Sequence, residues 1–392
     1  MDAQAFTLTE AATAELRNAL RARIVDGLSR EGGEIAALPA YLPLPSPALA
    51  GIVGVLDIGG TNVRAALVRV EGGGEALVVA GPLERRLEIR AADAQVDATS
   101  FFRTQAELIR ELEPPERAPY GYCFSYPART LPDRDAELLR WTKDIDVAGV
   151  VGTPVGSALR HALGKAGLKP GRVTVVNDTV ASLYAGSMHL TGLECARTIG
   201  LIVGTGSNMA AFFGLDKAPK LRTAPGLRGK MAVNLESGNF LPPHLTAADD
   251  AVDSASENPG RQRFEKAIAG YYLPQLYMRA RGADSELGEG DGTRALVALR
   301  DAGPESEPGR LAAALLGRSA DLVAAGLSAV MALLPPAGPT HVIAEGSLFW
   351  GDKQYRGRVE QTLRALTPER EFKIERRHSA NLIGAAGAAL TP

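Results

Sequence analysis

The sequence predicts an α/β fold made of two related halves. Strands and helices alternate along most of the chain, which is typical of α/β architecture. An apolar strand–turn–strand hairpin also occurs twice, at residues 53–67 and 199–213, with matching turn residues 146 positions apart. A chain of 392 residues suits two domains better than one small core. We therefore expect one copy of the hairpin in each half.

The chain is expected to begin with an amphipathic helix over residues 8–30. Leucine and isoleucine recur every four residues from Leu16 to Leu28, and Thr7 or Thr9 could cap the helix. A proline-rich linker is expected next, before the first hairpin.

The region between the hairpins continues the alternation. Short apolar runs and amphipathic segments predict strands at 77–79, 87–89 and 173–176, a strand entering a turn over 120–127, and helices at 99–112, 155–166 and 180–189. The pattern restarts after the second hairpin. We expect helix over 260–281, a surface excursion rich in Gly, Asp, Glu and Pro over 282–309, a long helix over 311–334, a strand and turn at 341–347 and a small-residue helix over 381–390.

The turns of the two hairpins have the composition of phosphate-binding loops. Gly60, Thr61 and Asn62 occupy the same places in the first turn as Gly206-Ser207-Asn208 in the second. Glycine lets backbone N–H groups approach an anion closely, and hydroxyls add further donors. Two ordinary hairpins with Gly-Asn turns are the alternative, which the repetition disfavours. The pair therefore predicts one nucleotide held between two related halves.

Composition narrows the partners and the compartment. The net charge is −2 without a long basic run, which disfavours nucleic acid and anionic membranes as partners. Cys123 and Cys195 suffice neither for a disulfide framework nor for a metal cluster, so we expect a reducing, cytoplasmic location. Acidic residues near the N-terminus disfavour a secretory signal. We also expect no apolar run long enough to span a bilayer.

Asp178 follows a predicted buried strand and begins a predicted helix. Open α/β sheets bind ligands at the carboxyl ends of their strands. An aspartate at this point can cap the helix. It can also act as the base that accepts the proton of an attacking hydroxyl in phosphoryl transfer. Local sequence leaves both roles open.

Several other polar residues could serve a phosphorylated or polyhydroxylated ligand. Lys143, after Thr142, is either a solvated surface residue or a cation for a transferring phosphoryl group. Glu236 and Glu265 are by default solvated acids. Sugar hydroxyls both donate and accept hydrogen bonds, so a mixed set of carboxylates and amides suits them. The residues that make up this set are Asn177, Asp178, Asn208, Glu236 and Glu265.

These motifs together resemble the hexokinase family of sugar kinases, the eukaryotic-type hexokinases and glucokinases of the actin-like ATPase superfamily. The segments that carry the resemblance are 38–42, 56–64, 124–127, 140–143, 177–180, 201–208, 233–236, 258–266 and 270–273. The resemblance implies two actin-like (ribonuclease H-like) domains flanking a deep cleft. It implies a small domain of residues 43–179 plus 377–392 and a large domain of residues 1–42 plus 180–376.

The resemblance also assigns residues to roles. Asp178 matches the catalytic base. The residues that match the sugar-contacting set are Ser125, Thr142, Lys143, Asn177, Asn208, Glu236 and Glu265, with Lys143 also near the phosphoryl group. Those that match the first phosphate loop are Asp57, Gly59, Gly60, Thr61, Asn62 and Arg64. Gly204, Thr205 and Gly206 match the second loop, and Gly346 and Ser347 match the turn on the adenosine side.

The implied reaction is transfer of the γ-phosphoryl group of ATP to the 6-hydroxyl of a hexose, most simply glucose, as the first step of glycolysis. Mg²⁺ would be held mostly by nucleotide phosphates and water, without a protein cage. The expected partners are the hexose and the nucleotide, for a monomer or homodimer. Three alternatives stay open: a kinase for another hexose or an amino sugar, a non-catalytic sugar sensor, and a member of the bacterial repressor/sugar-kinase family.

The chain departs from the family pattern at three places. Ser237 replaces the aromatic residue after the motif glutamate, and Asp144 replaces a glycine. Residues 378–381, His-Ser-Ala-Asn, replace an Asp-Gly-Ser-Gly turn near the nucleotide. Side chains on Ala380 and Asn381 would hinder a nucleotide's approach, so we expect weak discrimination among purine donors and some use of polyphosphate. The alternative is a local rearrangement that restores the same contacts through other backbone groups.

Overall fold

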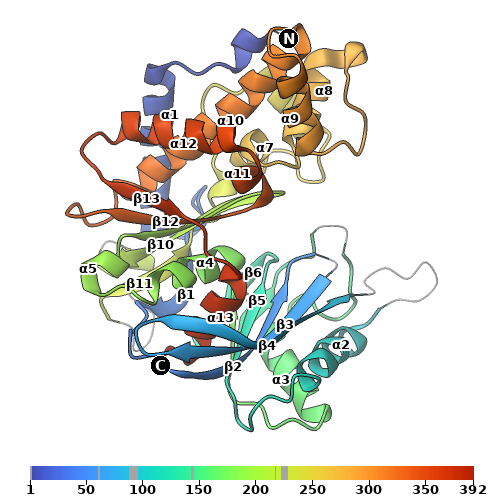
Figure 1. Cartoon of the computed structure of the whole chain (residues 1–392), viewed down its shortest axis with the longest axis vertical. Helices are drawn as coiled ribbons and strands as arrows, with labels where there is room; N and C mark the ends of the chain where they lie inside the picture. Colours follow the sequence, from blue (N-terminus) through green and yellow to red (C-terminus); the bar gives the residue numbers. More distant parts are fainter. Residues whose placement is uncertain (1, 61, 88–95, 143–144, 217, 222–227) are drawn as a thin grey trace.

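Two β-sheets form the centres of two halves of the molecule, one above the other in Figure 1. The computed structural model describes residues 2–60, 62–87, 96–142, 145–216, 218–221 and 228–392. Its mixture of helices and strands confirms the predicted α/β class.

The two sheets share one topology. The smaller has the order β4-β3-β2-β5-β8, and the larger has β11-β10-β9-β12-β13 in the same pattern, with β1 added at its edge. In the smaller sheet, β2, β3 and β4 form an antiparallel meander, β5 pairs in parallel with β2, and β8 pairs in parallel with β5. In the larger sheet, β9, β10 and β11 form the meander, β12 pairs in parallel with β9, and β13 pairs in parallel with β12. The repeat detected in the sequence is therefore a repeat of whole sheets.

The strands of the smaller sheet are β2 Gly51–Ile58, β3 Asn62–Glu71, β4 Glu75–Arg86, β5 Tyr120–Phe124 and β8 Val173–Val176. Those of the larger sheet are β1 Leu38–Pro43, β9 Thr198–Val203, β10 Ser207–Gly214, β11 Lys230–Asn234, β12 Thr340–Glu345 and β13 Phe372–Glu375. A separate small hairpin joins β6 Ala128–Thr130 to β7 Ala136–Leu138.

Helices cover the outer face of each sheet. The smaller sheet packs against α2 Ala98–Arg110 and α3 Val155–Lys165. The helices associated with the larger sheet are α1 Glu10–Ser29, α5 Gly192–Cys195, α6 Ala247–Ser254, α7 Arg263–Ile268, α8 Leu273–Arg281, α9 Thr293–Ala302, α10 Glu307–Met331, α11 Ser347–Gly351 and α12 Lys353–Leu366. Short 3₁₀ turns lie at Ala3–Phe6, Pro219–Leu221, Ser237–Asn239 and Gly282–Asp284.

Two helices lie between the sheets and contact each other. Helix α4, Asp178–Ser187, leaves the smaller sheet after β8 and packs on β9 and β12 of the larger. Helix α13, Ala380–Leu390, leaves the larger sheet after β13 and packs on β2 and β5 of the smaller. Each connection therefore crosses from one half to the other. Gly384 permits the contact, because a Cβ there would lie 1.7 Å from the Ala181 carbonyl oxygen.

The proline-rich linker contains a strand that the sequence analysis missed. Strand β1 pairs antiparallel with β11, with Pro39 opposite Val233 and Pro43 opposite Met231, and its register shifts between the two prolines. Proline lacks an N–H group, and an edge strand tolerates it because one side of the strand makes no ladder bonds.

Three other predicted segments differ in the structure. The expected strand at 77–79 lies within the longer strand β4, whose pairing with β3 is irregular near Gly81. Of the second expected strand, 87–89, Leu87 follows the end of β4 and is not in a strand, and 88–89 lie outside the described residues. The segment 260–281 is two helices, because Ala269 leaves helical geometry after α7. The expected surface excursion contains α9, which buries Leu296.

The long helix α10 also corrects an expectation. By length and composition it could cross a membrane, although the sequence analysis expected no such segment. In the fold, 89% of its apolar window is buried, and α10 contacts α1, α9 and α12. Its apolar composition therefore serves the core of the larger half.

The strands of the smaller sheet fall within the expected small-domain segment 43–179, and those of the larger sheet fall within 1–42 and 180–376 apart from the end of β1 at Pro43. The domain boundaries themselves remain a prediction. Cys123 and Cys195 are both buried and free.

Candidate active site

The carboxyl ends of three parallel strands bring the first group of predicted site residues to one edge of the smaller sheet. Asp57 on β2 lies opposite Cys123 on β5, which lies opposite Val176 on β8. The residues that follow these strands, Gly59, Ser125 and Asn177-Asp178, therefore lie side by side at this edge. Ser125 donates its N–H to the Ile58 carbonyl (3.0 Å), which links the ends of β2 and β5.

Asn177, not Asp178, is the cap of helix α4. The Asn177 side-chain oxygen accepts the Thr179 N–H at 2.9 Å, in extended backbone geometry suited to an N-cap. One oxygen of Asp178 accepts the same N–H at 2.8 Å and the Thr179 hydroxyl at 3.2 Å. Asp178 is half-buried, and these bonds orient its carboxylate. A capping role is therefore not needed to explain this aspartate.

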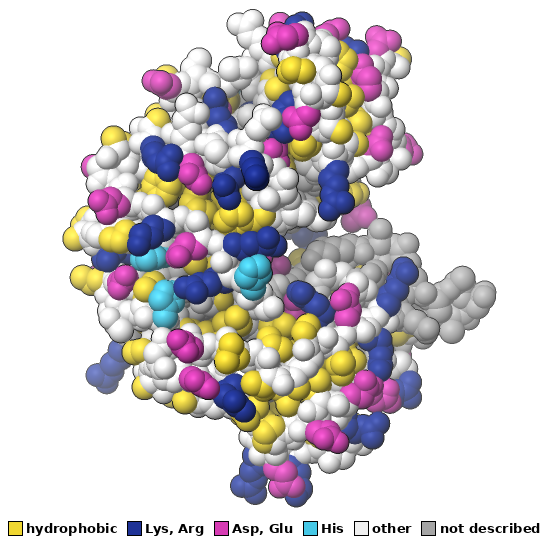
Figure 2. All heavy atoms as spheres, viewed as in Figure 1, with side chains coloured by type: hydrophobic (Ala, Val, Ile, Leu, Met, Phe, Trp, Pro, Cys, Tyr) yellow, Lys and Arg dark blue, Asp and Glu magenta, His cyan; other side chains and the backbone are white. Residues whose placement is uncertain are grey.

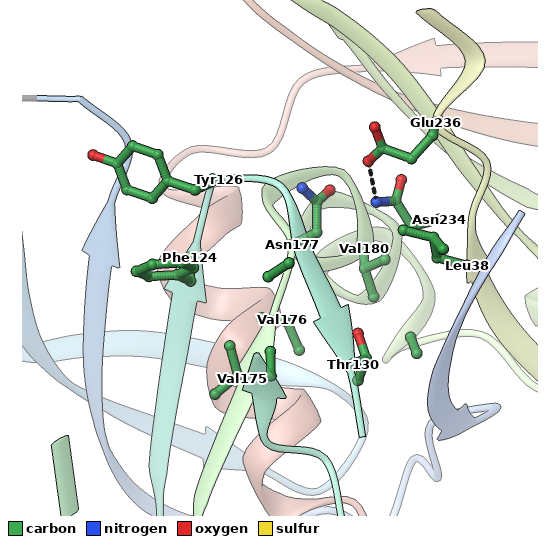
Figure 3. A pocket seen from close by; sticks show the side chains of 13 residues that line it. Leu38, Phe124, Tyr126, Thr130, Val175, Val176, Asn177, Val180, Asn234 and Glu236 are labelled. Carbon is green, nitrogen blue, oxygen red and sulfur yellow. Dashed lines mark hydrogen bonds between the residues drawn. The ribbon is translucent and has the colours of Figure 1, made fainter. Parts of the chain in front are cut away.

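On the larger half, a chain of hydrogen bonds joins Asn208 to Glu236. The Asn208 amide donates to the Asn234 side-chain oxygen (2.7 Å), and the Asn234 amide donates to Glu236 Oε1 (2.6 Å), as Figure 3 shows for the second bond. The Asn208 oxygen in turn accepts the N–H of Ser237 at 3.2 Å. Glu236 is thus held in place rather than solvated, which corrects the default expectation for this acid.

The electrostatics of Glu236 link the two halves of the site. Burial raises the pKa of Glu236, and the nearby Asp178 carboxylate raises it further, while the Asn234 hydrogen bond and Arg140 oppose the shift. Glu236 also has a left-handed backbone (φ 55°, ψ 45°), unusual for a residue with a side chain. The Glu236 carboxylate therefore lies within electrostatic range of a carboxylate on the opposite half.

Glu265 supports the second loop by a hydrogen bond to its backbone. Its Oε2 accepts the Ser207 N–H at 2.9 Å, and a Cβ on Gly206 would lie 3.0 Å from that same oxygen. Glu265 is half-buried and bonded, so it too differs from a solvated acid. Asn208 lies on β10, and Glu236 directly precedes the 3₁₀ turn Ser237–Asn239. Both β10 and this turn contact α7.

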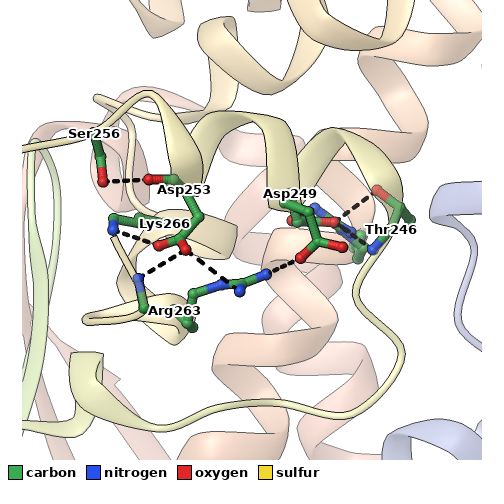
Figure 4. A network of polar contacts seen from close by, with 9 residues as sticks. Thr246, Asp249, Asp253, Ser256, Arg263 and Lys266 are labelled. Carbon is green, nitrogen blue, oxygen red and sulfur yellow. Dashed lines mark hydrogen bonds and ion pairs between the residues drawn. The ribbon is translucent and has the colours of Figure 1, made fainter. Parts of the chain in front are cut away.

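A buried ionic network fixes α7 and therefore Glu265 (Figure 4). The next residue, Lys266, is only 2% exposed and donates to Asp253 (2.6 Å) and to the Asn258 carbonyl (2.9 Å). Burial alone would raise the pKa of Asp253, but bonds from Lys266 and from the Gly260 N–H lower it overall. Lys266 is thereby anchored on one side of the helix while Glu265 reaches the loop on the other.

A pocket lies between these groups. Asn177 from the smaller half and Asn234 and Glu236 from the larger half form its polar part. Apolar side chains from β5, β8 and the start of α4 form its floor: Phe124, Val175, Val176 and Val180 (Figure 3). A small polar ligand could therefore contact both halves at once.

Charged and amide side chains surround the end of β2 at the first loop. Asp57 is 5% exposed and forms an ion pair with Arg64, which faces it from β3. Partial burial disfavours the charge of Arg64, but Asp57 beside it holds the Arg64 pKa above its usual value. The Asn381 amide, at the start of α13, lies 3.4 Å from both Asp57 oxygens. Asn381 therefore supports this loop, whereas the sequence analysis regarded it as an obstruction.

The turn of the first loop is open. Gly60 has a φ of 131°, which favours glycine, and a Cβ there would meet nothing within 4 Å. Asn62 is exposed and donates to Glu84 on β4 at 2.8 Å. Thr61, predicted as a phosphate contact, lies outside the described residues.

The second loop is packed closely against other backbone. Gly204 donates to the Gly206 carbonyl (2.9 Å) and accepts the Gly270 N–H (2.7 Å), while the Thr205 side chain is exposed. A Cβ on Gly346 would lie 2.1 Å from the Val203 carbonyl oxygen, so only glycine fits there. Gly346 and the following Ser347, the first residue of α11, therefore lie directly beside the loop.

The segment that precedes Lys143 is anchored by an aromatic cluster. Trp141 packs edge-on against Tyr126 and Phe101, and its Nε1 donates to the Val147 carbonyl (3.1 Å). Thr142 is half-buried directly after it. Lys143, the predicted phosphoryl cation, lies outside the described residues.

The sequence analysis did not single out Asn234 or Tyr126. Asn234 has a recognisable signal, because it lies two residues before Glu236 at the end of a strand. Among the residues that the structure describes, no group of three His, Cys, Asp or Glu side chains could hold a metal ion. Figure 2 shows acidic and basic side chains interspersed over the face in view, rather than gathered into one patch of single charge.

Two family models, both described as hexokinase, match residues 2–188 and residues 198–281 plus 309–391. The chain belongs to the hexokinase family. Hexokinase-7 of Oryza sativa subsp. japonica is 32% identical over 67% of this chain and 58% of its own length. Hexokinase-1 of Saccharomyces cerevisiae is 33% identical over 64% of this chain and 53% of its own length. The matched region thus spans just over half of these curated hexokinases.

Solved structures give the same family. A hexokinase from Schistosoma mansoni in complex with glucose superposes with a TM-score of 0.82 and 26% identity, covering 100% of this chain and 97% of that one. This match confirms two actin-like domains with a cleft between them. A ROK hexokinase from Thermus thermophilus, at a TM-score of 0.54 and 20% identity over 86% of this chain and 98% of that one, shares the fold alone.

Proposed function

We propose that this hexokinase transfers the γ-phosphoryl group of ATP to the 6-hydroxyl of glucose, as in the first step of glycolysis. One observation carries the proposal. Asp178, at the strand edge of the smaller half, directly follows Asn177, which lines the same pocket as Asn234 and Glu236 of the larger half. A base beside a pocket lined by amides and a hydroxyl-binding carboxylate suits an alcohol acceptor.

In this mechanism the hexose lies between the halves. Asn177, Asn208 and Glu236 contact its hydroxyls, together with Ser125, Thr142, Lys143 and Glu265. Asp178 takes the proton of the attacking hydroxyl as the bond to phosphorus forms. A ligand that contacts both halves stabilises the closed arrangement by its differential affinity, and closure excludes competing water.

The donor phosphates lie between the two glycine loops. Gly59, Gly60, Thr61 and Asn62 on one side and Gly204, Thr205 and Gly206 on the other offer backbone N–H groups, with Gly346 and Ser347 toward the adenosine. Bound Mg²⁺ would neutralise negative charge on the donor phosphates. Of the described residues, Asp57 and Asp178 offer carboxylates at this edge that would face an ion bound mainly by phosphate and water.

Glucose is the simplest choice of acceptor because the relative from Schistosoma mansoni was solved with glucose. A kinase for another hexose or an amino sugar remains the second candidate. A sensor without catalysis would not need the oriented Asp178 carboxylate. We also propose a cytoplasmic location, based on the two free cysteines.

The test is a coupled turnover assay with a panel of hexoses against ATP, GTP, ITP and polyphosphate. Asp178→Asn should lower kcat by about 10²–10⁴-fold while calorimetry shows hexose affinity within a few-fold of wild type. Asp301→Asn, at a half-exposed ion pair on α9, is the control. A variant that keeps more than about a tenth of wild-type kcat would remove Asp178 from the role of base. Glucose binding without turnover in the wild type would favour the sensor.

A further inference from the structure

The hydroxyl of Tyr126 makes two hydrogen bonds to a single residue of the first phosphate loop. It accepts the Gly60 N–H at 3.1 Å and donates to the Gly60 carbonyl oxygen at 2.7 Å. Gly60 has a positive φ and open space where a Cβ would be, so side-chain packing at this residue contributes nothing to its conformation. The Tyr126 hydroxyl therefore restrains the peptide groups of Gly60 from both sides.

The ring that carries this hydroxyl is itself fixed. Tyr126 is 4% exposed. Its ring lies 4.9 Å from the ring of Phe124 and 4.9 Å from the ring of Trp141, the latter edge-on at 82°. Because protein interiors are close-packed, the ring cannot turn without moving these neighbours. The core of the smaller half therefore sets the position of the hydroxyl, and through it the position of Gly60.

The two hydrogen bonds between the Tyr126 hydroxyl and Gly60 differ in length, and this difference lets the loop stay in position while it binds an anion. The bond to the carbonyl is the shorter, and the bond from the N–H is the longer. A charged phosphate oxygen is a stronger acceptor for an N–H than a phenol oxygen. A phosphate can therefore replace the hydroxyl at the Gly60 N–H while the hydroxyl keeps its bond to the carbonyl.

We propose that Tyr126 is a positioning residue for the phosphoryl donor: its hydroxyl holds the Gly60 peptide so that the first loop is preformed before a nucleotide arrives. This inference rests on the proposed function in so far as the donor is ATP. The ring also contacts Trp141, next to Thr142, so the same side chain joins the donor loop to the segment expected to contact sugar.

The test removes only the hydroxyl. Tyr126→Phe should raise the KM for ATP by about 3- to 10-fold, the range expected for one or two hydrogen bonds that preorganise a loop. The KM for the hexose should stay within 2-fold, and kcat should change less than the KM for ATP. Calorimetry with Mg²⁺–ATP in the absence of hexose should show the same loss of affinity.

Tyr122→Phe is the matched control. Tyr122 is on β5, four residues before Tyr126, is fully buried and donates its hydroxyl to Gln105 at 2.7 Å, away from the loop. Its loss should lower the unfolding midpoint at least as much as Tyr126→Phe and leave the KM for ATP unchanged. A general loss of stability would therefore affect both variants, whereas loop positioning affects only Tyr126→Phe.

Amide hydrogen exchange of the ligand-free protein gives a readout that does not depend on catalysis. Peptides that contain Gly60 should exchange faster in Tyr126→Phe than in wild type or Tyr122→Phe. Unchanged exchange, or an affinity for ATP that is unchanged or tighter in Tyr126→Phe, would overturn the inference. If the wild type phosphorylates no hexose, the proposed function fails, while exchange and ATP calorimetry still decide the role of Tyr126.

Discussion

The two phosphate hairpins are both antiparallel strand pairs, but their turns and surroundings differ. The first, β2–β3, ends its leading strand with Asp57, which Arg64 and Asn381 contact. The second, β9–β10, has Val203 and Ala210 at the positions of Asp57 and Arg64, and its loop packs instead against the backbone of Gly346 and Gly270. One copy therefore supports its loop with charge, and the other supports it with close backbone contact.

The asparagines at the end of the two turns differ in the same way. Asn62 is exposed and bonds to Glu84 on the neighbouring strand. Asn208 is half-buried and begins the chain of bonds that reaches Glu236. Under the proposed function, the first turn serves the donor, and the second serves the acceptor as well because of its link to Glu236.

Among the substitutions that compare the two hairpins, the largest effect should come from the charged support of the first loop. Asp57→Asn leaves the Arg64 guanidinium without its ionic partner and should lower kcat/KM for ATP about 10- to 100-fold, the scale of one hydrogen bond to a charged group. Steady-state kinetics measure this, with hexose affinity from calorimetry as the control. An equal loss of hexose affinity would show that the two loops do not divide their roles.

A paired substitution tests the divergence directly. Asn208→Ala leaves the Asn234 side-chain oxygen without its donor and should weaken hexose binding about 10-fold, with the KM for ATP changed less than 3-fold. Asn62→Ala, at the equivalent position of the first turn, should leave hexose affinity within 2-fold. Calorimetry with glucose compares the two. Equal effects of both variants on hexose affinity would contradict the proposed division.

Glu236 offers a smaller effect that depends on pH. Because the folded-state pKa of Glu236 is raised, the folded protein binds this proton more tightly than the unfolded chain, and stability is lost as pH rises through that pKa. Glu236→Gln removes the penalty and should raise the unfolding midpoint by about 1–2 °C at pH 7.5. The gain should shrink toward zero near pH 4. A gain that is the same at both pH values would assign it to something other than ionisation.

Hexose affinity should also depend on the ionisation of Glu236, but it should rise with pH where stability falls. The ionised carboxylate is the better acceptor for a sugar hydroxyl, so hexose affinity should fall as pH drops through the pKa of Glu236. Because that pKa is raised, the loss of affinity should begin at a higher pH than it would with an ordinary glutamate. Glu236→Gln should bind hexose more weakly and with less dependence on pH. Glu236 therefore lowers the stability of the folded protein at neutral pH while it serves binding.

Much of the fold could be predicted from local pattern. The helix at α1, the strand β8 and the two hairpins match their predicted positions closely, because each has a clear apolar period. Strand β1 could not be predicted in this way. Its prolines resemble a linker, and only pairing with β11, far away in the sequence, makes it a strand. Helix α9 was missed because it lies within a stretch rich in Gly, Asp, Glu and Pro, and it buries only Leu296 and Arg300.

The sequence predicted which types of residue form the site better than it predicted the contacts between them. The amide and carboxylate set was found because sugars need such groups, and the structure joins Asn208 to Glu236. The intermediary Asn234, the hold of Tyr126 on Gly60 and the anchor at Lys266 depend on side-chain directions that only the folded chain defines. Thr61 and Lys143 stay predictions, because they lie outside the described residues.

The smallest effect concerns the turn at 378–381, where the structure changes the expected mechanism. Ala380 is buried and Ser379 has a left-handed backbone, so the Asn381 amide faces Asp57 of the first loop, with 3.4 Å contacts. At that length the contacts are weak, so Asn381→Ala should raise the KM for ATP only about 2-fold. Asn381→Asp, which adds a like charge beside Asp57, should raise it more.

Comparing ATP with GTP as donors decides whether this turn acts on the phosphates or on the base of the nucleotide. If Asn381 acts through Asp57 on the phosphates, Asn381→Ala should raise the KM for ATP and for GTP by the same factor. A change in the ratio of kcat/KM between ATP and GTP would instead place the side chain near the base. Weak discrimination among purine donors is still expected for the wild type. A preference for ATP above about 100-fold, near 2.7 kcal/mol, would contradict it.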